Sequence, residues 1–553
     1  MSREEYKFLN IAKTLEEANA LVQQLDVSKY RTSGLRDGTK YSYRCRFYRK
    51  YPLCRYEVQI YIPDNEFDMI KLMYKNAHCH EQRNVTGRLP SPVRESVNKY
   101  VTCQLTQGQI KNALSIDYPN IPLPINQLTS LINYTRRRNN PEIFSVYDFN
   151  QWCMNHNYDD NLLYSTFVPY YSIKNIDDIF VFFTTKQLIQ QIQCTTLLQV
   201  DATYKLTWNN LPLLVFGSSD ADRHFCPFGI ALVSSDEHSS CFKELFIQLQ
   251  NISAKYFNRQ YTVNYIMADG APGITKAQQE VFPQAKRLMC WAHTVRKIRE
   301  HRKLVPTDKW NEVDSDIHNL QLCFSDNIFN CAVSLLNLKW NNYPLMKQFQ
   351  EYFFNEWIKK LPLWYEGAAC HIPSTNNGCE SLNGKIKQQY TLRNKLHLSS
   401  FLPKIEQMLH AWPIKSSSNG FIAKPSISTE LELTAFKWSN TINQIDILHW
   451  FGNWYIVPSS NPTITPAMWL QIYQMQQWQT FNDFIIWLKS CYLVSPLHSC
   501  TCPKGMKLYI CKHSFGLAMI FNMHEVKDKT RSELLGQRRG KGRSKKVKSA
   551  LEF

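Results

Sequence analysis

The sequence has no uninterrupted apolar run of the roughly 18 residues that a membrane-spanning helix needs. Its first residues, MSREEYKFLN, lack the apolar core of a secretory signal peptide, so we expect neither a membrane protein nor a secreted one. No internal repeat explains any part of the chain. Acidic residues are scarce, since 64 Lys and Arg exceed 46 Asp and Glu by a net charge of +18. This excess favours a polyanionic partner, with nucleic acid ahead of a membrane surface, over a merely solubilising charge.

Without a secretory context, the 17 cysteines are expected to be thiols and zinc ligands rather than a disulfide framework. A chain of 553 residues is too long for one ordinary core, which suggests roughly three to four domains. Hydrophobic residues make up 44% of the sequence, so most of the chain is expected to fold.

Three carboxylates stand in settings that suit metal-dependent chemistry. Asp201 lies inside an apolar run, Leu197 to Leu206, which predicts a buried strand, and Asp269 follows a second run at the start of a Gly-Ala-Pro-Gly loop. Glu380 follows the loop STNNG, a helix-start signal, and is predicted in a first helical turn. Two Asp on neighbouring strand ends and a Glu on a packed helix provide the hard oxygen ligands that Mg²⁺ requires. The alternative is three unrelated acids among 46.

Five separated blocks around these acids carry a family resemblance. VDATYK, LPLLVFGSSDADRHFCPFGIALVSSDEH, MADGA, CWAH and NNGCESLNGKIK together resemble the catalytic domain of Mutator-like element (MULE) transposases, from about Leu197 to about Lys387. The resemblance implies the DDE/D superfamily, an RNase H-like fold and a two-metal mechanism with Mg²⁺ or Mn²⁺. It assigns Asp201, Asp269 and Glu380 to the catalytic triad.

The order of apolar segments in this region fits such a fold. The first three segments can form an antiparallel meander, and a helix near 240–253 can then cross over to a parallel strand beside the first. Asp201 and Asp269 would then lie on adjacent strands, with Asp220 and Asp222 as less favoured catalytic alternatives. A stretch at about 300–370 is helical in period and predicts a helical insertion between the second and third carboxylates.

Several residues near the acids are candidates for supporting roles. Cys290 and His293 form a C-x2-H pair that resembles the C/H motif of MULE domains, for which we expect a structural role beside the site or a DNA contact. Two ligands alone do not make a zinc site, and a core Cys beside a hydrogen-bonded His is the simpler alternative. Lys385 and Lys387, after Glu380, suit phosphate contacts.

Residues 1–88 predict a small β-rich module that a structural metal would help to stabilise. The candidate Zn²⁺ ligands are Cys45, Cys54, His78 and His80. Their spacing, C-x8-C-x23-H-x-H, suits tetrahedral zinc and resembles WRKY-like and FLYWCH fingers. Cys79, between the two histidines, is a competing ligand.

Residues 89–190 predict a helical connector, with three short helices from about Ser91 to Arg138. Thr106 and Gln109 form a capping-box signal for the second helix. The third helix runs into three consecutive arginines, Arg136, Arg137 and Arg138. This pattern fits a helix-turn-helix DNA reader with arginines on phosphates, or equally a plain connector with a solvated basic end.

After the catalytic domain, predicted at 191–400, residues 401–489 predict a further helical region. Residues 490–522 contain Cys500, Cys502, Cys511 and His513 in the C-x-C-x8-C-x-H spacing of the SWIM zinc finger. Residues 523–553 are strongly basic and Gly-rich, which predicts a disordered tail that binds phosphates or acts as a nuclear address.

The sequence therefore predicts a multidomain α/β chain, with an RNase H-like mixed-sheet domain flanked by a β-rich zinc finger and a SWIM zinc finger. The resemblance implies a nuclear DNA transposase that binds terminal inverted repeats and catalyses strand cleavage and strand transfer as a homodimer or larger assembly on double-stranded DNA. The alternative is a domesticated, noncatalytic transcription regulator, because plant light-signalling regulators share this order of modules.

Overall fold

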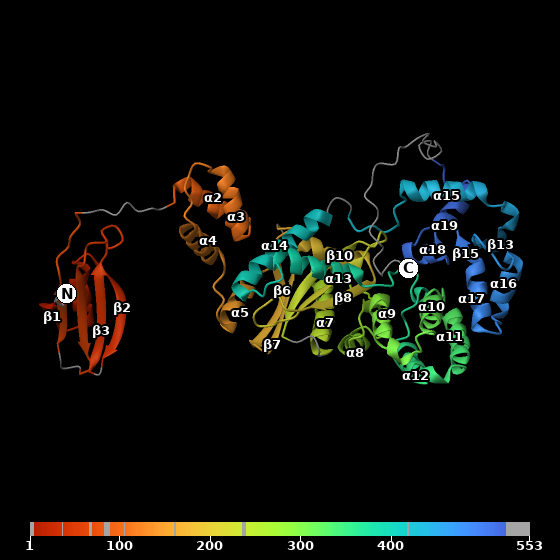
Figure 1. Cartoon of the computed structure of the whole chain (residues 1–553), viewed down its shortest axis with the longest axis horizontal. Helices are drawn as coiled ribbons and strands as arrows, with labels where there is room; N and C mark the ends of the chain where they lie inside the picture. The colour runs from red at the N-terminus through yellow and green to blue at the C-terminus, as the bar shows by residue number, and fades with distance from the viewer. Residues whose placement is uncertain are drawn as a thin grey trace. The chain divides into compact units, whose positions relative to one another are not determined.

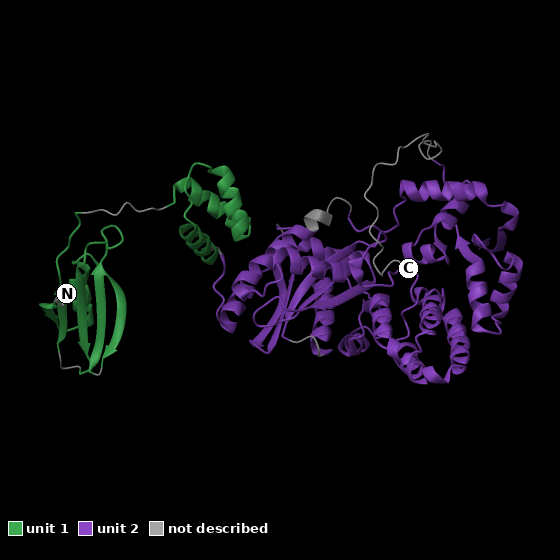
Figure 2. Ribbon diagram, viewed as in Figure 1, with its two compact units in different colours: residues 1–139 green, residues 140–553 purple. Residues whose placement is uncertain are grey.

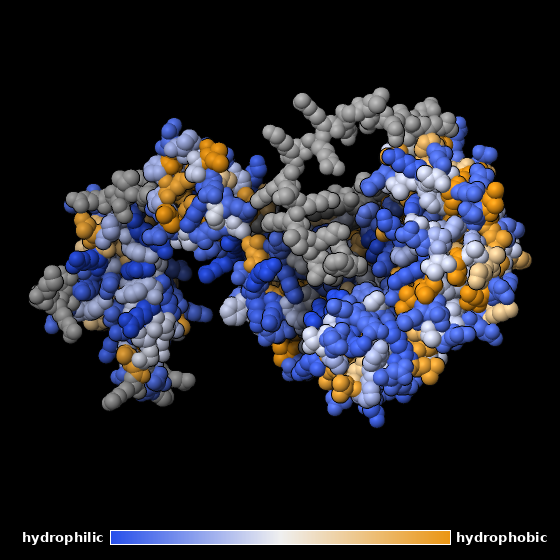
Figure 3. Space-filling model, turned by 45° about the vertical axis from the view of Figure 1, so that its right-hand side comes forward, coloured by the Kyte–Doolittle hydropathy of each residue, from blue (hydrophilic) through white to orange (hydrophobic). Residues whose placement is uncertain are grey.

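The computed structural model describes residues 5–35, 37–65, 69–81, 89–103, 105–159, 162–234, 239–416 and 420–526 (Figure 1). The chain divides into two compact units, residues 1–139 and 140–553 (Figure 2). Hydrophilic residues predominate on the face shown in Figure 3. Within the described ranges, no helix combines the length and the apolarity needed to cross a membrane.

The first unit begins with a five-stranded antiparallel sheet in the order β1-β5-β4-β3-β2. Its elements are β1 (Lys7–Ala12), α1 (Leu15–Gln23), β2 (Val27–Leu35), β3 (Gly38–Cys45), β4 (Glu57–Pro63) and β5 (Ile70–Lys75). Ala18 and Val22 of α1 are buried in one cluster with Val58 and Ile60 of β4. The β-rich module predicted from the sequence is confirmed.

Three helices follow, α2 (Ser91–Thr102), α3 (Gln107–Asp117) and α4 (Ile125–Asn139). The Thr106 hydroxyl accepts a hydrogen bond from the Gln109 N–H, and the Gln109 side-chain oxygen accepts one from the Thr106 N–H, so the predicted capping box is confirmed. The helices bury one small apolar core that includes Val97, Leu114 and Ile132.

The described residues of the second unit form a seven-stranded sheet in the order β12-β11-β8-β9-β10-β7-β6. Its strands are β6 (Phe167–Asn175), β7 (Asp178–Thr184), β8 (Leu197–Thr203), β9 (Leu213–Ser219), β10 (Phe225–Val233), β11 (Tyr265–Ala268) and β12 (Lys286–Met289). Strands β8, β9 and β10 are antiparallel, and β11 runs parallel to both β8 and β12. The predicted meander and crossover are confirmed.

Strands β6 and β7 correct the prediction that 89–190 is a helical connector. The segment DIFVFFT is a nearly continuous run of β-branched and aromatic residues, which favours a strand buried on both faces. Only Asp178 of β7 is exposed, and β7 pairs with β10. The helical prediction therefore holds for α2 to α4 and for α5 (Val146–Met154), and is wrong for the two strands that extend the sheet.

Alternating side chains divide the sheet into two apolar faces. Val200 and Phe216 share a core with α7 (Ser239–Phe257), and Val215 lies in the other core with α14 (Leu398–Ser416). Figure 1 shows α7 and α14 on opposite sides of the sheet. Asp201 is directly opposite Val215 in the β8–β9 register, so its side chain lies on the α14 face.

The predicted insertion between the second and third carboxylates is helical, as expected. After α9 (Trp291–Glu300), it contains α10 (Trp310–Gln321), α11 (Asp326–Asn341), α12 (Lys347–Phe353) and a π-helix (Phe354–Lys360). Its large aromatic residues, such as Trp340 and Phe349, are fully buried. They share one core with α16 (Pro466–Met475) and α17 (Phe481–Ser490), so most of these rings are core residues.

The C-terminal part contains a four-stranded sheet in the order β13-β14-β15-β16. Its strands are β13 (Leu448–Phe451), β14 (Trp454–Pro458), β15 (Cys491–Ser495) and β16 (Ser499–Cys500). The prediction that 401–489 is a helical region is therefore wrong for β13 and β14. β13 pairs with β14, and β14 pairs with β15, which in turn pairs with β16, the strand that contains Cys500. The basic sequence at 527–553 lies outside the described residues.

Candidate active site and metal-ligand clusters

Asp201 lies on β8 and faces α13 (Asn377–Lys385). The side-chain amide of Asn383 donates a hydrogen bond to Asp201 Oδ2 at 2.8 Å. Burial, followed by the negative charges of Asp269 and Glu380, raises the pKa of Asp201 from 3.8 to about 7. The three predicted carboxylates are thus close enough for each of the other two to oppose ionisation of Asp201.

Asp269 follows the last residue of β11, where the strand becomes a loop, as predicted. Its Oδ1 accepts a hydrogen bond from the backbone N–H of Ala271 at 3.0 Å. The guanidinium of Arg287, on β12, donates to the carbonyl oxygens of Ala268 and Asp269 and so holds the strand end. Burial lowers the pKa of Arg287 to about 10. Across the described ranges, neither Asp201 nor Asp269 forms an ion pair with a lysine or arginine side chain.

Glu380 lies in the first turn of α13, as predicted. The loop before this helix is fixed to β8 by Asn376, which is fully buried. Its amide group donates to the Val200 carbonyl at 3.0 Å and accepts from Gln199 Nε2 at 3.3 Å. These bonds join α13 to the two residues that precede Asp201, so the loop sets the position of Glu380 relative to Asp201.

The first turn of α13 also lies very close to β10. A Cβ added at Gly378 would be 2.6 Å from Cβ of Phe225, a separation that packed side chains do not allow. Gly378 therefore permits the helix to approach the sheet.

Cys290 and His293 lie at the start of α9, directly after β12. Cys290 is fully buried, and its Sγ accepts a hydrogen bond from the backbone N–H of Asn376 at 3.2 Å. The thiol therefore contacts the loop that carries Glu380, which agrees with the expected structural position beside the site.

His293 does not meet the expectation of an ordinary hydrogen-bonded core histidine. Its Nδ1 lies 3.3 Å from Glu380 Oε1, yet the two atoms lack hydrogen-bond geometry. Both atoms are buried without a hydrogen-bond partner in the part of the chain that the structure describes. Burial lowers the pKa of His293. One ligand atom from each of Cys290, His293 and Glu380 lies within 4.8 Å of the other two.

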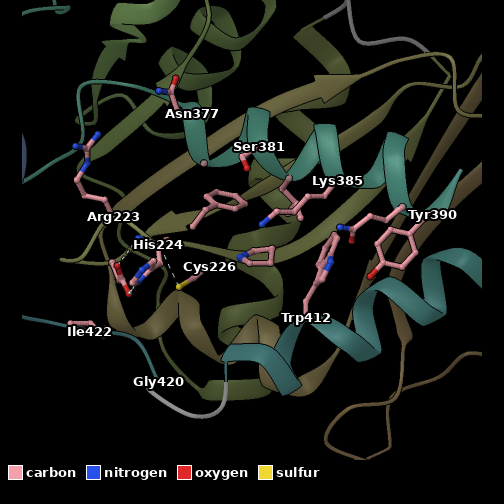
Figure 4. Close-up of a pocket in the computed structure, with 16 residues that line it drawn as sticks. Arg223, His224, Cys226, Asn377, Ser381, Lys385, Tyr390, Trp412, Gly420 and Ile422 are labelled. Atoms are coloured by element: carbon pink, nitrogen blue, oxygen red, sulfur yellow. Dashed lines mark hydrogen bonds and ion pairs between the residues drawn. The ribbon is translucent and has the colours of Figure 1, made fainter. Parts of the chain in front are cut away.

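A cavity of about 680 Å³ runs along the side of α13 (Figure 4). Ser381 and Lys385 line it from α13, Arg223 and His224 line it from the β9–β10 turn, and Trp412 lines it from α14. Lys385 is therefore placed where a phosphate contact is possible. Lys387, two residues later, is not among the lining residues.

A second cavity, of about 340 Å³, adjoins the loop of Asp269. Its lining combines His293 and Lys297 of α9 with Tyr352 and Trp357 of the insertion. The insertion thus brings aromatic rings and a cation next to one of the carboxylates, although core packing accounts for most of its other aromatic residues.

Asp220 and Asp222, the less favoured catalytic alternatives, have structural partners instead. Asp220 Oδ1 accepts the N–H of His224 at 2.8 Å and closes the β9–β10 turn. Asp222 Oδ1 accepts the N–H of Ser426 at 2.6 Å.

The four predicted ligands of the N-terminal module come together. Cys45 Sγ lies 3.2 Å from His80 Nε2, and Cys54 Sγ lies 3.6 Å from His78 Nδ1. The other ring nitrogen of His78 is 3.0 Å from the Leu25 carbonyl, an arrangement that orients metal-binding histidines. Cys79 is exposed and outside this cluster. The cluster could bind zinc.

The four predicted ligands near the C-terminus also form one cluster, and all are buried. His513 Nδ1 lies 3.7 Å from Cys500 Sγ and 3.8 Å from Cys511 Sγ. The N–H of Gly505 donates to Cys502 Sγ at 3.2 Å. This cluster could bind a second zinc ion.

The three consecutive arginines differ in their surroundings. Arg136 donates to the Leu105 carbonyl at 2.8 Å, and burial lowers its pKa. Arg137 and Arg138 are exposed. Arg136 is thus a structural residue of the three-helix core, and only its two neighbours are available for phosphate.

Sequence reasoning missed the amide residues that position the carboxylates. Asn383 is three residues after Glu380, so helical periodicity would have placed both on one face of α13. Gln199 and Asn376 had no comparable signal, because they meet across 177 residues of sequence.

Residues 197–297 match the family model of the MULE transposase domain. This stretch includes Asp201, Asp269, Cys290 and His293 and ends before Glu380. The match supports a transposase-related function, and a transposase domain implies DNA as a partner. A search of curated proteins gave no match.

Proposed function

We propose that this chain is a MULE-type DNA transposase that binds terminal inverted repeats and catalyses metal-dependent DNA strand cleavage and strand transfer. The observation that carries the proposal is that residues 197–297, which contain Asp201 and Asp269, match the MULE transposase domain, and the charges of Asp269 and Glu380 both act on Asp201. Strand order β12-β11-β8-β9-β10, with β11 and β12 parallel to β8, supports an RNase H-like fold for this domain.

The three carboxylates fit Mg²⁺ or Mn²⁺, because their donors are hard oxygens and, among the described residues, no lysine or arginine forms an ion pair with the two aspartates. When bound, two such ions would activate the attacking water or 3′-hydroxyl and stabilise the leaving oxygen of a phosphodiester. The protein's own contribution is positioning. Asn383 orients Asp201, and Arg287 holds the strand end at Asp269, while Asn376 fixes the loop before Glu380.

We assign DNA contacts to the cationic surfaces of each unit. The cavity beside α13 offers Lys385, and the helical part of the first unit offers Arg137 and Arg138. The two Cys/His clusters would each hold a zinc ion that stabilises a DNA-binding module. A nuclear location and a dimer or larger assembly that holds two element ends belong to the same proposal.

Cleavage of labelled DNA that carries the element's own ends tests the proposal directly. The reaction is run with Mg²⁺, Mn²⁺ or EDTA, and wild type is compared with Glu380→Gln and Asp269→Ala. We expect metal-dependent cleavage that falls at least about 100-fold in both variants, with DNA affinity retained. Asp178→Asn changes an exposed acid of the same sheet and should leave cleavage intact. Equal loss of binding and cleavage would contradict these roles.

A noncatalytic, transposase-derived regulator is the second candidate. Both Cys/His clusters and the exposed arginines could serve DNA binding without the carboxylates. Tight, sequence-selective binding with no cleavage under any of these metals would favour the regulator.

A further inference from the structure

The contact between α9 and α13 contains a spacing that an ordinary ion pair does not explain. His293 Nδ1 and Glu380 Oε1 lie 3.3 Å apart, and neither of these buried atoms has a hydrogen-bond partner among the residues that the structure describes. Leaving such buried polar groups unpaired is energetically unfavourable. Two buried polar atoms at this distance without hydrogen-bond geometry suggest that both bind the same metal ion.

The distance agrees with tetrahedral zinc coordination. Two nitrogen or oxygen ligands, each about 2.05 Å from a tetrahedral ion, lie about 3.3 Å apart. Sulfur and nitrogen ligands of the same ion lie about 3.6 Å apart. The corresponding distances are 3.2 and 3.6 Å in the N-terminal cluster and 3.7 and 3.8 Å in the C-terminal cluster. The α9–α13 contact thus has the nitrogen-to-oxygen spacing expected for tetrahedral zinc.

Cys290 provides a third possible metal ligand. Cys290 is one helical turn before His293, and its sulfur belongs to the same group of atoms within 4.8 Å. We propose that Cys290, His293 and Glu380 form a third transition-metal site, of the zinc type. Thiolate and imidazole ligands favour Zn²⁺ over Mg²⁺, and three protein ligands leave one coordination position open for water or a phosphate oxygen.

A metal ion at this site would also position Glu380 for the proposed Mg²⁺ site. This second role rests on the proposed function, whereas the metal binding does not. Glu380 has two carboxylate oxygens, so one can bind the zinc-type ion while the other serves the Mg²⁺ site. The ion would then tie α13 to the end of β12 and fix the side chain of Glu380. Cys290 and His293 are positioning residues in this scheme.

Metal content of the full-length protein tests the inference without any measurement of activity. After removal of loosely bound metal, we expect three zinc equivalents per chain in the wild type and two in Cys290→Ser. His293→Gln should also hold two, which provides a second test if the serine variant folds poorly. Cys379→Ser is the matched control, because Cys379 is a fully buried thiol next to Glu380 but outside the cluster, and it should retain three.

Cobalt substitution gives an independent readout of the same site. Co²⁺ titration of the wild type should saturate the thiolate-to-metal absorption with one more equivalent than titration of Cys290→Ser. Two equivalents in the wild type, unchanged by either substitution, would overturn the third site. Cleavage activity with only two zinc equivalents per chain would support the proposed transposase and reject the third site. Three zinc equivalents without cleavage would support the third site and reject the transposase.

Discussion

Replacement of Asp201 by asparagine should increase the stability of the metal-free protein while it abolishes cleavage. The pKa of Asp201 rises from 3.8 to about 7 because the side chain is buried and lies near two other acids. Asparagine cannot ionise, and its amide oxygen can still accept the hydrogen bond from Asn383. The substitution therefore removes the charge and keeps the local contact.

The sign and size follow from proton linkage. Between about pH 4 and pH 7 the folded state holds a proton on Asp201 that the unfolded chain has released, so stability falls as pH rises through this window. A shift of about three pKa units at 1.36 kcal/mol each gives an upper limit of about 4 kcal/mol above pH 7. At pH 4 and below the penalty is absent. Free Mg²⁺ at 100 times its Kd would raise the free energy of unfolding of the wild type by about 2.7 kcal/mol.

Thermal and urea unfolding of the full-length chain in EDTA, at pH 5 and pH 8, measure this effect. We expect the stability advantage of Asp201→Asn to grow by 1 kcal/mol or more between the two pH values. Added Mg²⁺ should reduce the advantage at pH 8 by stabilising the wild type, and Asp178→Asn should show neither effect. If Asp201→Asn destabilises the protein equally at both pH values, the view of Asp201 as a strained, buried acid is wrong.

Three further outcomes are expected. Asn376→Ala should lower the free energy of unfolding by about 1–3 kcal/mol, because it leaves buried hydrogen-bonding groups unpaired, and should reduce cleavage; urea unfolding and cleavage assays measure these effects. Gly505→Ala should remove one zinc equivalent, because its Cβ would collide with the carbonyl of Cys500 in the C-terminal cluster; metal analysis measures this. Arg137→Ala should weaken DNA binding and lower the salt slope by about 1, whereas Arg136→Ala should mainly lower the melting temperature of the first unit.

The strand order of the catalytic region could be predicted because hydrophobic runs and their spacing encode it. β8 to β12 are each marked by a compact apolar segment, with Asp201 inside β8 and Asp269 directly after β11. β6 and β7 have equally strong strand signals, but they precede the residues that resemble the MULE family and were assigned to the connector. β13 and β14, of four and five residues, are too short for periodicity to separate them from the helices around them.

Helical periodicity alone predicts different surroundings for the three consecutive arginines, which the sequence analysis treated as one basic run. Leu128 and Ile132 are buried on α4, and Arg136 is the next position at a spacing of four. Helical periodicity therefore places Arg136 toward the core and its two neighbours toward solvent. The contact of Glu380 with His293 had no such signal, because the whole helical insertion separates the two residues.

The setting of the carboxylates bears on the choice between a transposase and a regulator. In the folded protein, burial and the charges of Asp269 and Glu380 oppose the charge of Asp201 more than its hydrogen bonds favour it. The side-chain oxygen of an asparagine at position 201 could still accept the hydrogen bond from Asn383, and the repulsion from Asp269 and Glu380 would be absent. A protein that only binds DNA would be more stable without the acid, whereas a protein that binds divalent ions requires it. The retention of Asp201 in this setting therefore supports the proposed metal-dependent activity.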